Sequence, residues 1–303
     1  MKAKSLKVKN VLIVRPDALG DVILMIPMIN TLKATYPKVK ITVLLQKYAA
    51  PLLENHPNVD ALIIDQKKEG RCNSTKDFIS YAKEIRSEKF DSVIFSYLDG
   101  FYASLMCAAG IPIRIGDGQK LLIRLLLTHP VNQYFRQLAI HETEQNIRLL
   151  DALKSPLVLD TKMNLKCDSK SDNAIKLLLS EFKCNPKEYV IVHPATGGGN
   201  RAWSPEKYAK LINLIHKQTS LKVILTGFGA KEKEINKAIV NGCKIKPINC
   251  FERTSLQELM SLIKSAKVIV GTDTGPTHIA AALKVPVICI SPTKFVKSLR
   301  WGP

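Results

Sequence analysis

The sequence predicts an α/β protein made of two doubly wound domains, each built on a parallel β-sheet. Strand-length runs of apolar, mostly β-branched residues alternate with segments of helical periodicity, and the connections between them are short. This alternation occurs twice, with a polar linker at about 161–172 between the two rounds. The length of 303 residues fits two domains of ordinary size. We therefore expect one domain over 1–160 and a second over 173–303.

The first round is expected to contain five strands and their connecting helices. Apolar residues at 10–15 predict the first strand, and the helical periodicity of 22–36 predicts the helix that follows it. The runs that predict the other strands lie at 40–45, 59–64, 91–96 and 111–116. Further helices are expected at about 46–54, 78–86, 101–109 and 142–153.

The segment 117–141 breaks this alternation. Its apolar run at 119–127 carries two cations, and Arg136 and two histidines lie close by in the sequence. One interpretation is a loop that faces a membrane or an acceptor, with apolar side chains against lipid tails and cations against anionic headgroups. The other is a core helix whose cations reach outward to solvent.

The second round repeats the pattern and ends in a βαβ unit at 267–291. Ser204 and Pro205 predict the start of one of its helices, because serine is a good N-cap and proline a good first helical residue. Helices are expected at 174–182, 205–218, 231–240 and 255–265. Strands are expected at 188–193, 222–226, 248–250, 268–270 and 285–290.

Glycines and polar residues fill the turn of the last βαβ unit, at 271–278. At a junction between a strand and a helix, free backbone N–H groups and the positive end of the helix dipole favour a phosphate. Asp273, Thr274, Gly275 and His278 therefore predict either a cradle for a nucleotide diphosphate or a capped turn. In the capped turn, Asp273 or Thr274 is the N-cap.

Two further strand-to-helix turns carry charged side chains. Three glycines and then Arg201 follow the strand at 188–193, which makes an anion-binding loop or an exposed loop with a solvated arginine. Asp21 falls at or near the N-terminus of the first helix. It is either a simple N-cap or a base at the mouth of a cleft, since ligands of open α/β sheets gather at the carboxyl ends of the strands.

The composition points to an anionic partner. The chain has 45 Lys and Arg against 26 Asp and Glu, which gives a formal charge of +19. Only 6% of the residues are aromatic, so there is little material for base stacking, and no nucleic-acid partner is expected. A membrane surface or a phosphorylated sugar fits better, and a lysine-rich host proteome is the simpler alternative.

The seven cysteines show no CxxC pair and no spacing suited to zinc. They are interpreted as reduced thiols of a cytoplasmic protein. No uninterrupted apolar span of 18 residues occurs, so any membrane association is expected to be peripheral.

These stretches together resemble the lipopolysaccharide heptosyltransferase family, glycosyltransferase family 9. The resemblance covers nearly the whole chain and rests on RPDALGDVILMIP at 15–27, HPATGGGNRAWSPEKYAKLI at 193–212, LTGFGAKEKE at 225–234, VGTDTGPTHIAAAL at 270–283 and ISPT at 290–293. It implies two Rossmann-like domains facing a cleft, the GT-B architecture, with the acceptor bound by the first domain and the donor by the second.

The resemblance also implies an activity. The expected reaction is an inverting, metal-independent transfer of heptose from ADP-heptose to a lipid A-linked lipopolysaccharide core acceptor, with no cofactor. The enzyme is expected to be cytoplasmic and peripheral at the inner face of the cytoplasmic membrane, whose surface is anionic. The alternatives are a transferase for another nucleotide-activated sugar and a non-catalytic ADP-sugar-binding homologue.

Site residues carry over by position. Asp21 aligns with the proposed general base, because an acceptor hydroxyl must lose a proton as it attacks the anomeric carbon. Asp273 is expected to orient the donor, and either Glu232 or Glu234 to hold ribose hydroxyls. The groups expected to stabilise and bind the departing ADP are Arg201, Thr196, Gly197, Thr274, Gly275 and His278. The acceptor-side candidates are Arg114, Lys120 and His141, and no residue is expected to bind a metal.

Two features depart from the family pattern. Position 201 is arginine where relatives often have lysine, a change that keeps the charge but alters the geometry. Relatives usually continue beyond Pro303 into a helix that packs back across the first domain. The two interpretations are a naturally short chain and a truncated sequence that lacks this C-terminal helix.

Overall fold

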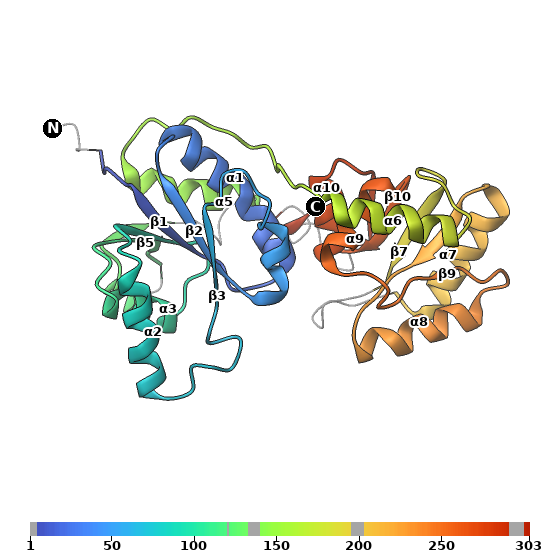
Figure 1. The fold of residues 1–303 in the computed structure, drawn as a ribbon, viewed down its shortest axis with the longest axis horizontal. Coiled ribbons are helices and arrows are strands. Elements are labelled where there is room, and N and C mark those ends of the chain that lie inside the picture. The colour runs from blue at the N-terminus through green and yellow to red at the C-terminus, as the bar shows by residue number, and fades with distance from the viewer. Residues whose placement is uncertain (1–4, 120, 133–139, 195–202, 291–299) are drawn as a thin grey trace. The chain divides into compact units, whose positions relative to one another are not determined.

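The computed structural model describes residues 5–119, 121–132, 140–194, 203–290 and 300–303. Contacts divide the chain into two compact units, Met1–Asn164 and Leu165–Pro303. Each unit contains a parallel β-sheet with helices on both faces (Figure 1). The fold class predicted from the sequence is therefore confirmed, while the acceptor and donor roles of the two domains stay predictions.

A six-stranded parallel sheet forms the centre of the N-terminal unit, in the order β3-β2-β1-β4-β5-β6. Its strands are β1 (Asn10–Val14), β2 (Lys40–Leu45), β3 (Ala61–Ile64), β4 (Ser92–Phe95), β5 (Ile113–Asp117) and β6 (His129–Val131). The strand order reverses between β1 and β4, the type of position at which open α/β sheets bind ligands.

Helices cover both faces of this sheet (Figure 1). On one face α1 (Leu19–Thr35) packs against α5 (Glu142–Arg148), and on the other α2 (Thr75–Ser87) packs against α3 (Gly100–Ala108). Two 3-10 helices, η1 (Lys47–Leu52) and η2 (Leu149–Leu153), and the short α4 (Leu121–Arg124) complete the unit.

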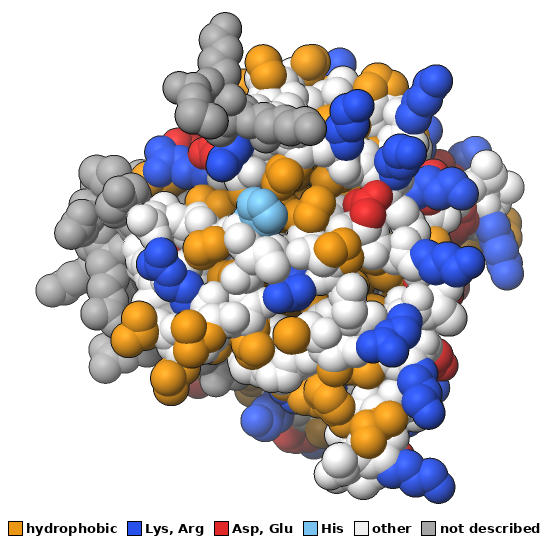
Figure 2. Space-filling view, turned by 90° about the vertical axis from the view of Figure 1, so that its left-hand side faces the viewer, with side chains coloured by type: hydrophobic (Ala, Val, Ile, Leu, Met, Phe, Trp, Pro, Cys, Tyr) orange, Lys and Arg blue, Asp and Glu red, His pale blue; other side chains and the backbone are white. Residues whose placement is uncertain are grey.

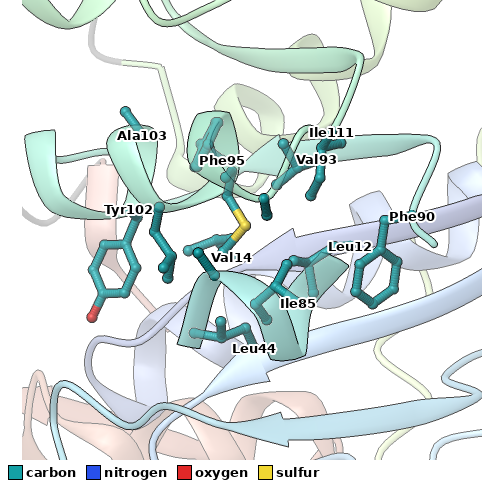
Figure 3. Packing of buried hydrophobic residues seen from close by; sticks show 14 of the residues in the cluster. Leu12, Val14, Leu44, Ile85, Phe90, Val93, Phe95, Tyr102, Ala103 and Ile111 are labelled. Carbon is teal, nitrogen blue, oxygen red and sulfur yellow. The ribbon is translucent and has the colours of Figure 1, made fainter. Parts of the chain in front are cut away.

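Alternate residues of the central strands build the core between the sheet and the α2–α3 pair. Leu12 and Val14 of β1 point to this face, as do Val93 and Phe95 of β4, because successive side chains of a strand alternate between faces. Tyr102 of α3 packs against them (Figure 3). The core thereby fixes the carboxyl ends of β1 and β4 relative to each other.

A five-stranded parallel sheet forms the centre of the C-terminal unit, in the order β11-β10-β7-β8-β9. Its strands are β7 (Tyr189–His193), β8 (Lys222–Leu225), β9 (Ile248–Asn249), β10 (Val268–Thr272) and β11 (Val287–Ile290). Its helices are α6 (Ser169–Glu181), α7 (Pro205–Gln218), α8 (Ala230–Gly242), α9 (Leu256–Ser265) and α10 (Gly275–Ala282).

The central strand β7 is buried over its whole length, as its near-continuous apolar sequence requires. On one face α7 and α8 pack together over a core that includes Val192, Leu225 and Tyr208. On the other face α9 packs against both α6 and α10. This packing fixes the first turn of α10 at the carboxyl end of β10.

The structure differs from the sequence-based expectation in the segment 117–141. It contains a sixth strand, β6, which the sequence did not indicate because its three residues include Pro130 and form no apolar run. The interpretation of 119–127 as a core helix is wrong, since α4 has no buried residue and the Leu122 and Leu125 side chains are each 83% exposed. Leu127 alone among these leucines is fully packed into the core.

Several helix boundaries also differ from the predicted ones. α1 begins at Leu19 with Ala18 as its N-cap, so Asp21 lies inside the first turn and is not the cap. α6 begins inside the expected linker, because the Asp168 carboxylate caps it by accepting a 2.6 Å hydrogen bond from the N–H of Ser171. The helix expected at 46–54 is the 3-10 helix η1, and the one expected at 142–153 is divided between α5 and η2.

Candidate active site

Polar side chains gather in each unit at the carboxyl ends of the parallel strands. In the N-terminal unit they follow β1 and β4, and in the C-terminal unit they follow β7, β8 and β10. Carboxyl ends of parallel strands meet at one edge of a sheet, where α/β proteins bind their ligands. Each of these two edges is a candidate binding site.

Thr274 is the N-cap of α10, which decides between the two caps expected from the sequence. Its N–H donates to the Thr277 hydroxyl at 3.2 Å, and that hydroxyl donates to the carbonyl oxygens of Thr272 and Thr274 at 2.9 and 2.7 Å. Thr277 is fully buried, so these bonds lie inside the fold. They hold the first turn of α10 in a fixed orientation.

The Asp273 carboxylate contacts the imidazole of His278, about one helical turn later in the chain. His278 Nε2 lies 3.1 Å from Asp273 Oδ1, and the two side chains are 6% and 18% exposed. The other ring nitrogen of His278, Nδ1, is buried and has no hydrogen-bond partner among the described residues. The structure thus brings Asp273, Thr274, Gly275 and His278 together at one helix N-terminus.

Of the two candidate glutamates on α8, Glu232 lies at the strand edge. Its carboxylate accepts a 2.7 Å hydrogen bond from the N–H of Phe228, in the turn that follows β8. Burial raises the pKa of Glu232, and the N–H of Phe228 opposes this rise. Glu234 is exposed. The geometry therefore favours Glu232 as the glutamate that can face a ligand.

His193, the last residue of β7, is buried at the same edge. Its Nδ1 lies 3.0 Å from the Thr226 hydroxyl, and burial lowers the pKa of His193 to about 4. The imidazole is therefore neutral at pH 7. In the sequence this residue ends a predicted strand and opens the motif at 193–212, and it was not singled out as a site residue.

In the N-terminal unit, Asp21 is bound to a buried arginine. Arg15 follows β1, where its N–H continues the sheet by donating to the carbonyl of Leu44, and its side chain is 2% exposed. The Nη2 atom of Arg15 lies 2.8 Å from Asp21 Oδ1. Its Nε lies 2.9 Å from Asp17 Oδ1, and its Nη1 lies 3.3 Å from Glu142 Oε1.

The surroundings of Arg15 and Asp17 shift the pKa of both groups. Burial alone lowers the pKa of Arg15, but the carboxylates of Asp17, Asp21 and Glu142 outweigh it and raise the pKa. Burial raises the pKa of Asp17 to about 7, against the opposing charge of Arg15 and with a further rise from the nearby carboxylates. Among the described residues, the candidate base thus belongs to a cluster in which Asp17, Asp21 and Glu142 contact Arg15.

The acceptor-side candidates have different surroundings. His141 is the N-cap of α5, directly before Glu142, and its Nδ1 accepts from the N–H of Thr143 at 3.3 Å. Arg114 is the second residue of β5, and its guanidinium donates to the carbonyls of Leu126 and Ile111, each at 2.6 Å. Arg114 therefore anchors the 117–127 segment to the sheet.

Four predicted site residues lie outside the described residues: Thr196, Gly197, Arg201 and Lys120. Within the residues that the structure does describe, no group of three or more His, Cys, Asp and Glu side chains is arranged to hold a metal ion.

Sequence reasoning missed Arg15, Asp17 and Glu142 as site residues. A signal was present for Arg15, because a charged residue directly after an apolar strand is rarely buried unless it is paired. No such signal existed for Glu142, which meets Arg15 across 127 positions of the chain.

The chain has two α/β units, each with a parallel sheet and a polar edge at the carboxyl ends of its strands. This architecture defines the class of protein: it is the GT-B fold of glycosyltransferases. Solved structures of that fold match nearly the whole chain. A glycosyl transferase family 9 protein from Veillonella parvula DSM 2008 matches with a TM-score of 0.85 and 22% identity, over 100% of this chain and 85% of that one. E. coli heptosyltransferase WaaC with ADP-2-deoxy-2-fluoro heptose matches with a TM-score of 0.73 and 20% identity, over 94% and 90%.

The family model of glycosyltransferase family 9 (heptosyltransferase) matches residues 78–295, and the chain belongs to this family. It is therefore a glycosyltransferase, as the resemblance implied. Lipopolysaccharide heptosyltransferase 3 of Escherichia coli strain K12 is 29% identical over 282 residues, which cover 89% of this chain and 79% of that relative.

Proposed function

We propose that the protein transfers a heptose from ADP-heptose to a lipid A-linked lipopolysaccharide core acceptor, with inversion and without a metal ion. Support comes from family membership, from a relative named lipopolysaccharide heptosyltransferase 3, and from the ADP-heptose analogue held by the similar WaaC structure. The single observation that carries the proposal is the N-terminus of α10, where Asp273 and His278 flank a fixed first turn.

The C-terminal unit is proposed to bind the donor. The N–H of Gly275, the first residue of α10, has no acceptor within the helix, and the helix dipole adds positive charge at the same place. A diphosphate suits such a site. Glu232 lies near the carboxyl end of β8, two strands away from β10, and would accept hydrogen bonds from ribose hydroxyls. Arg201, Thr196 and Gly197 stay predictions for the same ligand.

The N-terminal unit is proposed to bind the acceptor and to supply the base. The Asp21 carboxylate takes the proton of the acceptor hydroxyl while that oxygen forms a bond to the anomeric carbon. The bond from the anomeric carbon to the β-phosphate oxygen breaks on the opposite face, and ADP leaves with the electron pair. Arg201 and the α10 N-terminus stabilise the charge on the leaving ADP.

A membrane-embedded acceptor would require the enzyme to work at a lipid surface. No helix within the described part of the chain is long and apolar enough to span a membrane. Instead, the Leu121, Leu122 and Leu125 side chains project from and directly after α4, exposed by 78%, 83% and 83%. Figure 2 shows apolar side chains at the surface among many Lys and Arg and few Asp and Glu. We propose that the surface around Leu121, Leu122 and Leu125 makes peripheral contact with the anionic inner face of the cytoplasmic membrane.

Calorimetric titration tests the donor assignment first. ADP should bind in preference to UDP, GDP and AMP, with and without magnesium, and Asp273→Asn should weaken its binding. Transfer is then assayed with ADP-heptose and a heptose-free core acceptor, and the anomeric configuration of the product is read by NMR. Tight binding of UDP or GDP instead would point to another activated sugar, and ADP binding without transfer to a non-catalytic homologue.

A further inference from the structure

Phe228 is the most exposed aromatic side chain among the residues that the structure describes. It lies in the turn between β8 and α8 and is 75% exposed. The next most exposed, Tyr48, is 49% exposed. Single apolar side chains are common at protein surfaces, so exposure alone assigns Phe228 no role. The order of its backbone and its place in the fold carry the argument.

Hydrogen bonds from two directions hold the backbone of this turn. The N–H of Phe228 donates to the Glu232 carboxylate at 2.7 Å, and the N–H of Gly229 donates to the Glu252 carboxylate at 3.0 Å. The carbonyl of Gly227 accepts from the N–H of Glu252 at 3.1 Å. Gly229 has a φ of +81°, which favours glycine. An exposed ring is thus attached to a fixed backbone, and a ligand that contacts it has little left to order.

The turn lies at the same sheet edge as the proposed diphosphate site. Only β7 separates β8 from β10, so the carboxyl ends of β8 and β10 are about 10 Å apart, or two strand spacings. The diphosphate and ribose of a nucleotide bridge such a distance. A nucleotide whose phosphates lie at the N-terminus of α10 therefore reaches the turn that follows β8.

The base of that nucleotide would lie beside Phe228. In the proposed donor complex Glu232 holds the ribose hydroxyls, and its carboxylate already contacts the backbone of Phe228. The base is joined to C1′ of the ribose, the carbon next to the one that carries the 2′ hydroxyl. A ribose held at Glu232 therefore brings the flat face of its base within reach of the phenyl ring.

We propose that Phe228 stacks on the base of the donor nucleotide and adds to both the affinity and the base preference of the site. The proposal rests on the proposed donor site. An aromatic ring gives a base a flat apolar face, and every base can use it. A two-ring purine covers more of the phenyl ring than a one-ring pyrimidine does, so Phe228 favours ADP over UDP. It does not separate adenine from guanine, because both are purines.

Calorimetric titration tests the stacking. Phe228→Ala should weaken ADP binding by about fivefold or more, as expected for one stacked base, and UDP binding should fall less. Phe228→Tyr keeps the ring and should bind ADP as the wild type does. Ile245→Ala is the matched control, because Ile245 is 58% exposed in the same unit but precedes β9, at the opposite edge of the sheet. Equal ADP affinity of Phe228→Ala and the wild type would overturn the proposal.

A ligand without a base separates stacking from damage to the turn. Methyl β-D-ribofuranoside 5-diphosphate keeps the ribose and both phosphates of ADP but carries a methoxy group in place of adenine. Its affinity is measured by displacement of ADP. Phe228→Ala should bind it as the wild type does, because it has no base to stack. A loss equal to the loss for ADP would show that the substitution disturbs the turn, and the stacking would then be wrong.

NMR gives a readout that does not depend on affinity. In deuterated protein whose phenylalanine rings alone are protonated, the H2 and H8 protons of bound ADP should show nuclear Overhauser effects to a ring. Phe228→Leu should remove them. Effects that persist in this variant would assign the contact to another phenylalanine and overturn the proposal.

Failure of the stacking can be told apart from failure of the proposed function. If Asp273→Asn weakens ADP binding and Phe228→Ala does not, the donor site stands and the stacking alone is wrong. If the wild type binds no nucleoside diphosphate, the donor site and the stacking both fail. Weaker binding of Phe228→Ala to phosphatidylglycerol vesicles, with unchanged ADP affinity, would assign the ring to a lipid surface instead.

Discussion

His278 Nε2 lies 3.1 Å from Asp273 Oδ1, at the junction where β10 ends and α10 begins. The contact closes one turn, since the two residues are five positions apart. It holds the Asp273 carboxylate in place before any ligand arrives, and a preorganised site loses less conformational entropy on binding. In the proposed donor site the histidine would therefore act through the aspartate as well as by its own position.

His278→Ala should weaken ADP binding by about tenfold, because a hydrogen bond to a charged group contributes about 1.5–3 kcal/mol and part of that orders Asp273. Calorimetric titration of ADP measures the change. His216→Ala, a substitution of another histidine of the same unit near the end of α7, is the matched control and should bind ADP as the wild type does. Equal affinity of all three proteins would show that the contact is only structural.

Glu232→Gln and Glu234→Gln test which glutamate contacts the ribose. A glutamine at 232 can still accept from the N–H of Phe228, so the turn after β8 is retained while the charge is lost. Charge-assisted hydrogen bonds are roughly twice as strong as neutral ones, and ADP affinity should fall by about tenfold. Glu234→Gln should leave the affinity unchanged, because Glu234 is exposed. The reverse result would move the ribose contact to Glu234.

Gly227→Ala should disturb the same turn by crowding. A Cβ at this position would lie 2.6 Å from Asn236 Nδ2 and 3.2 Å from Glu232 Oε2, so neighbouring side chains must move. We expect a loss of about 1–3 kcal/mol in stability, typical of overpacking, together with weaker ADP binding. Thermal unfolding and calorimetry measure the two effects. Gly100→Ala is the control, because a Cβ there meets nothing within 4 Å, and an equal effect of both substitutions would contradict the crowding argument.

Much of the fold could be predicted from the sequence because its strands are long apolar runs. β1 and β7 are buried on both faces, which demands apolar residues at consecutive positions and makes such strands easy to recognise. β6 was not predicted because it lies at the edge of the sheet, where a strand can consist of three residues and include a proline. A strand can therefore be predicted from the sequence where it is buried on both faces, and the sequence signal is weak where it is not.

Some residues of the candidate site could likewise be predicted from the sequence, and others could not. Asp273, Thr274 and His278 could be predicted as a group because five positions of continuous chain bring them together. Glu142 could not, because its contact with Arg15 depends on how α5 packs against α1, and that packing is a property of the whole unit. The sequence also left the choice between Asp273 and Thr274 as N-cap open, and the fixed orientation of Thr277 decides it.

The stability of the C-terminal unit should depend on pH through His193. Burial lowers its pKa to about 4, whereas the unfolded chain has the ordinary value near 6.5. The folded state therefore binds this proton more weakly than the unfolded state. The stabilisation is complete above about pH 6.5 and is lost as the pH falls towards 4.

Urea unfolding at a series of pH values measures this dependence, and tryptophan fluorescence reports on the C-terminal unit because both tryptophans, Trp203 and Trp301, belong to it. Between pH 7 and 4 the wild type should lose up to about 3 kcal/mol more than His193→Gln, which cannot titrate. Parallel pH profiles of the two proteins would show that His193 is not the group responsible.

Leu122→Ser with Leu125→Ser tests the proposed membrane surface. Both side chains are 83% exposed, so the double variant removes apolar surface without opening the core. If they insert into lipid, their loss should weaken binding to vesicles that contain phosphatidylglycerol by at least about tenfold, because a buried leucine contributes about 1.5–3 kcal/mol. Cosedimentation with vesicles measures the binding.

Leu177→Ser on α6 is the matched control, since that leucine is 75% exposed but lies in the other unit. The salt dependence of binding distinguishes electrostatic attraction to the membrane from insertion of the leucines. The net charge of +19 predicts that added salt weakens binding of the wild type and of the double variant alike, because screening acts on the charges and not on the leucines. Binding that depends on salt but not on Leu122 and Leu125 would mean that the chain is held by charge alone, and α4 would then have no part in membrane contact.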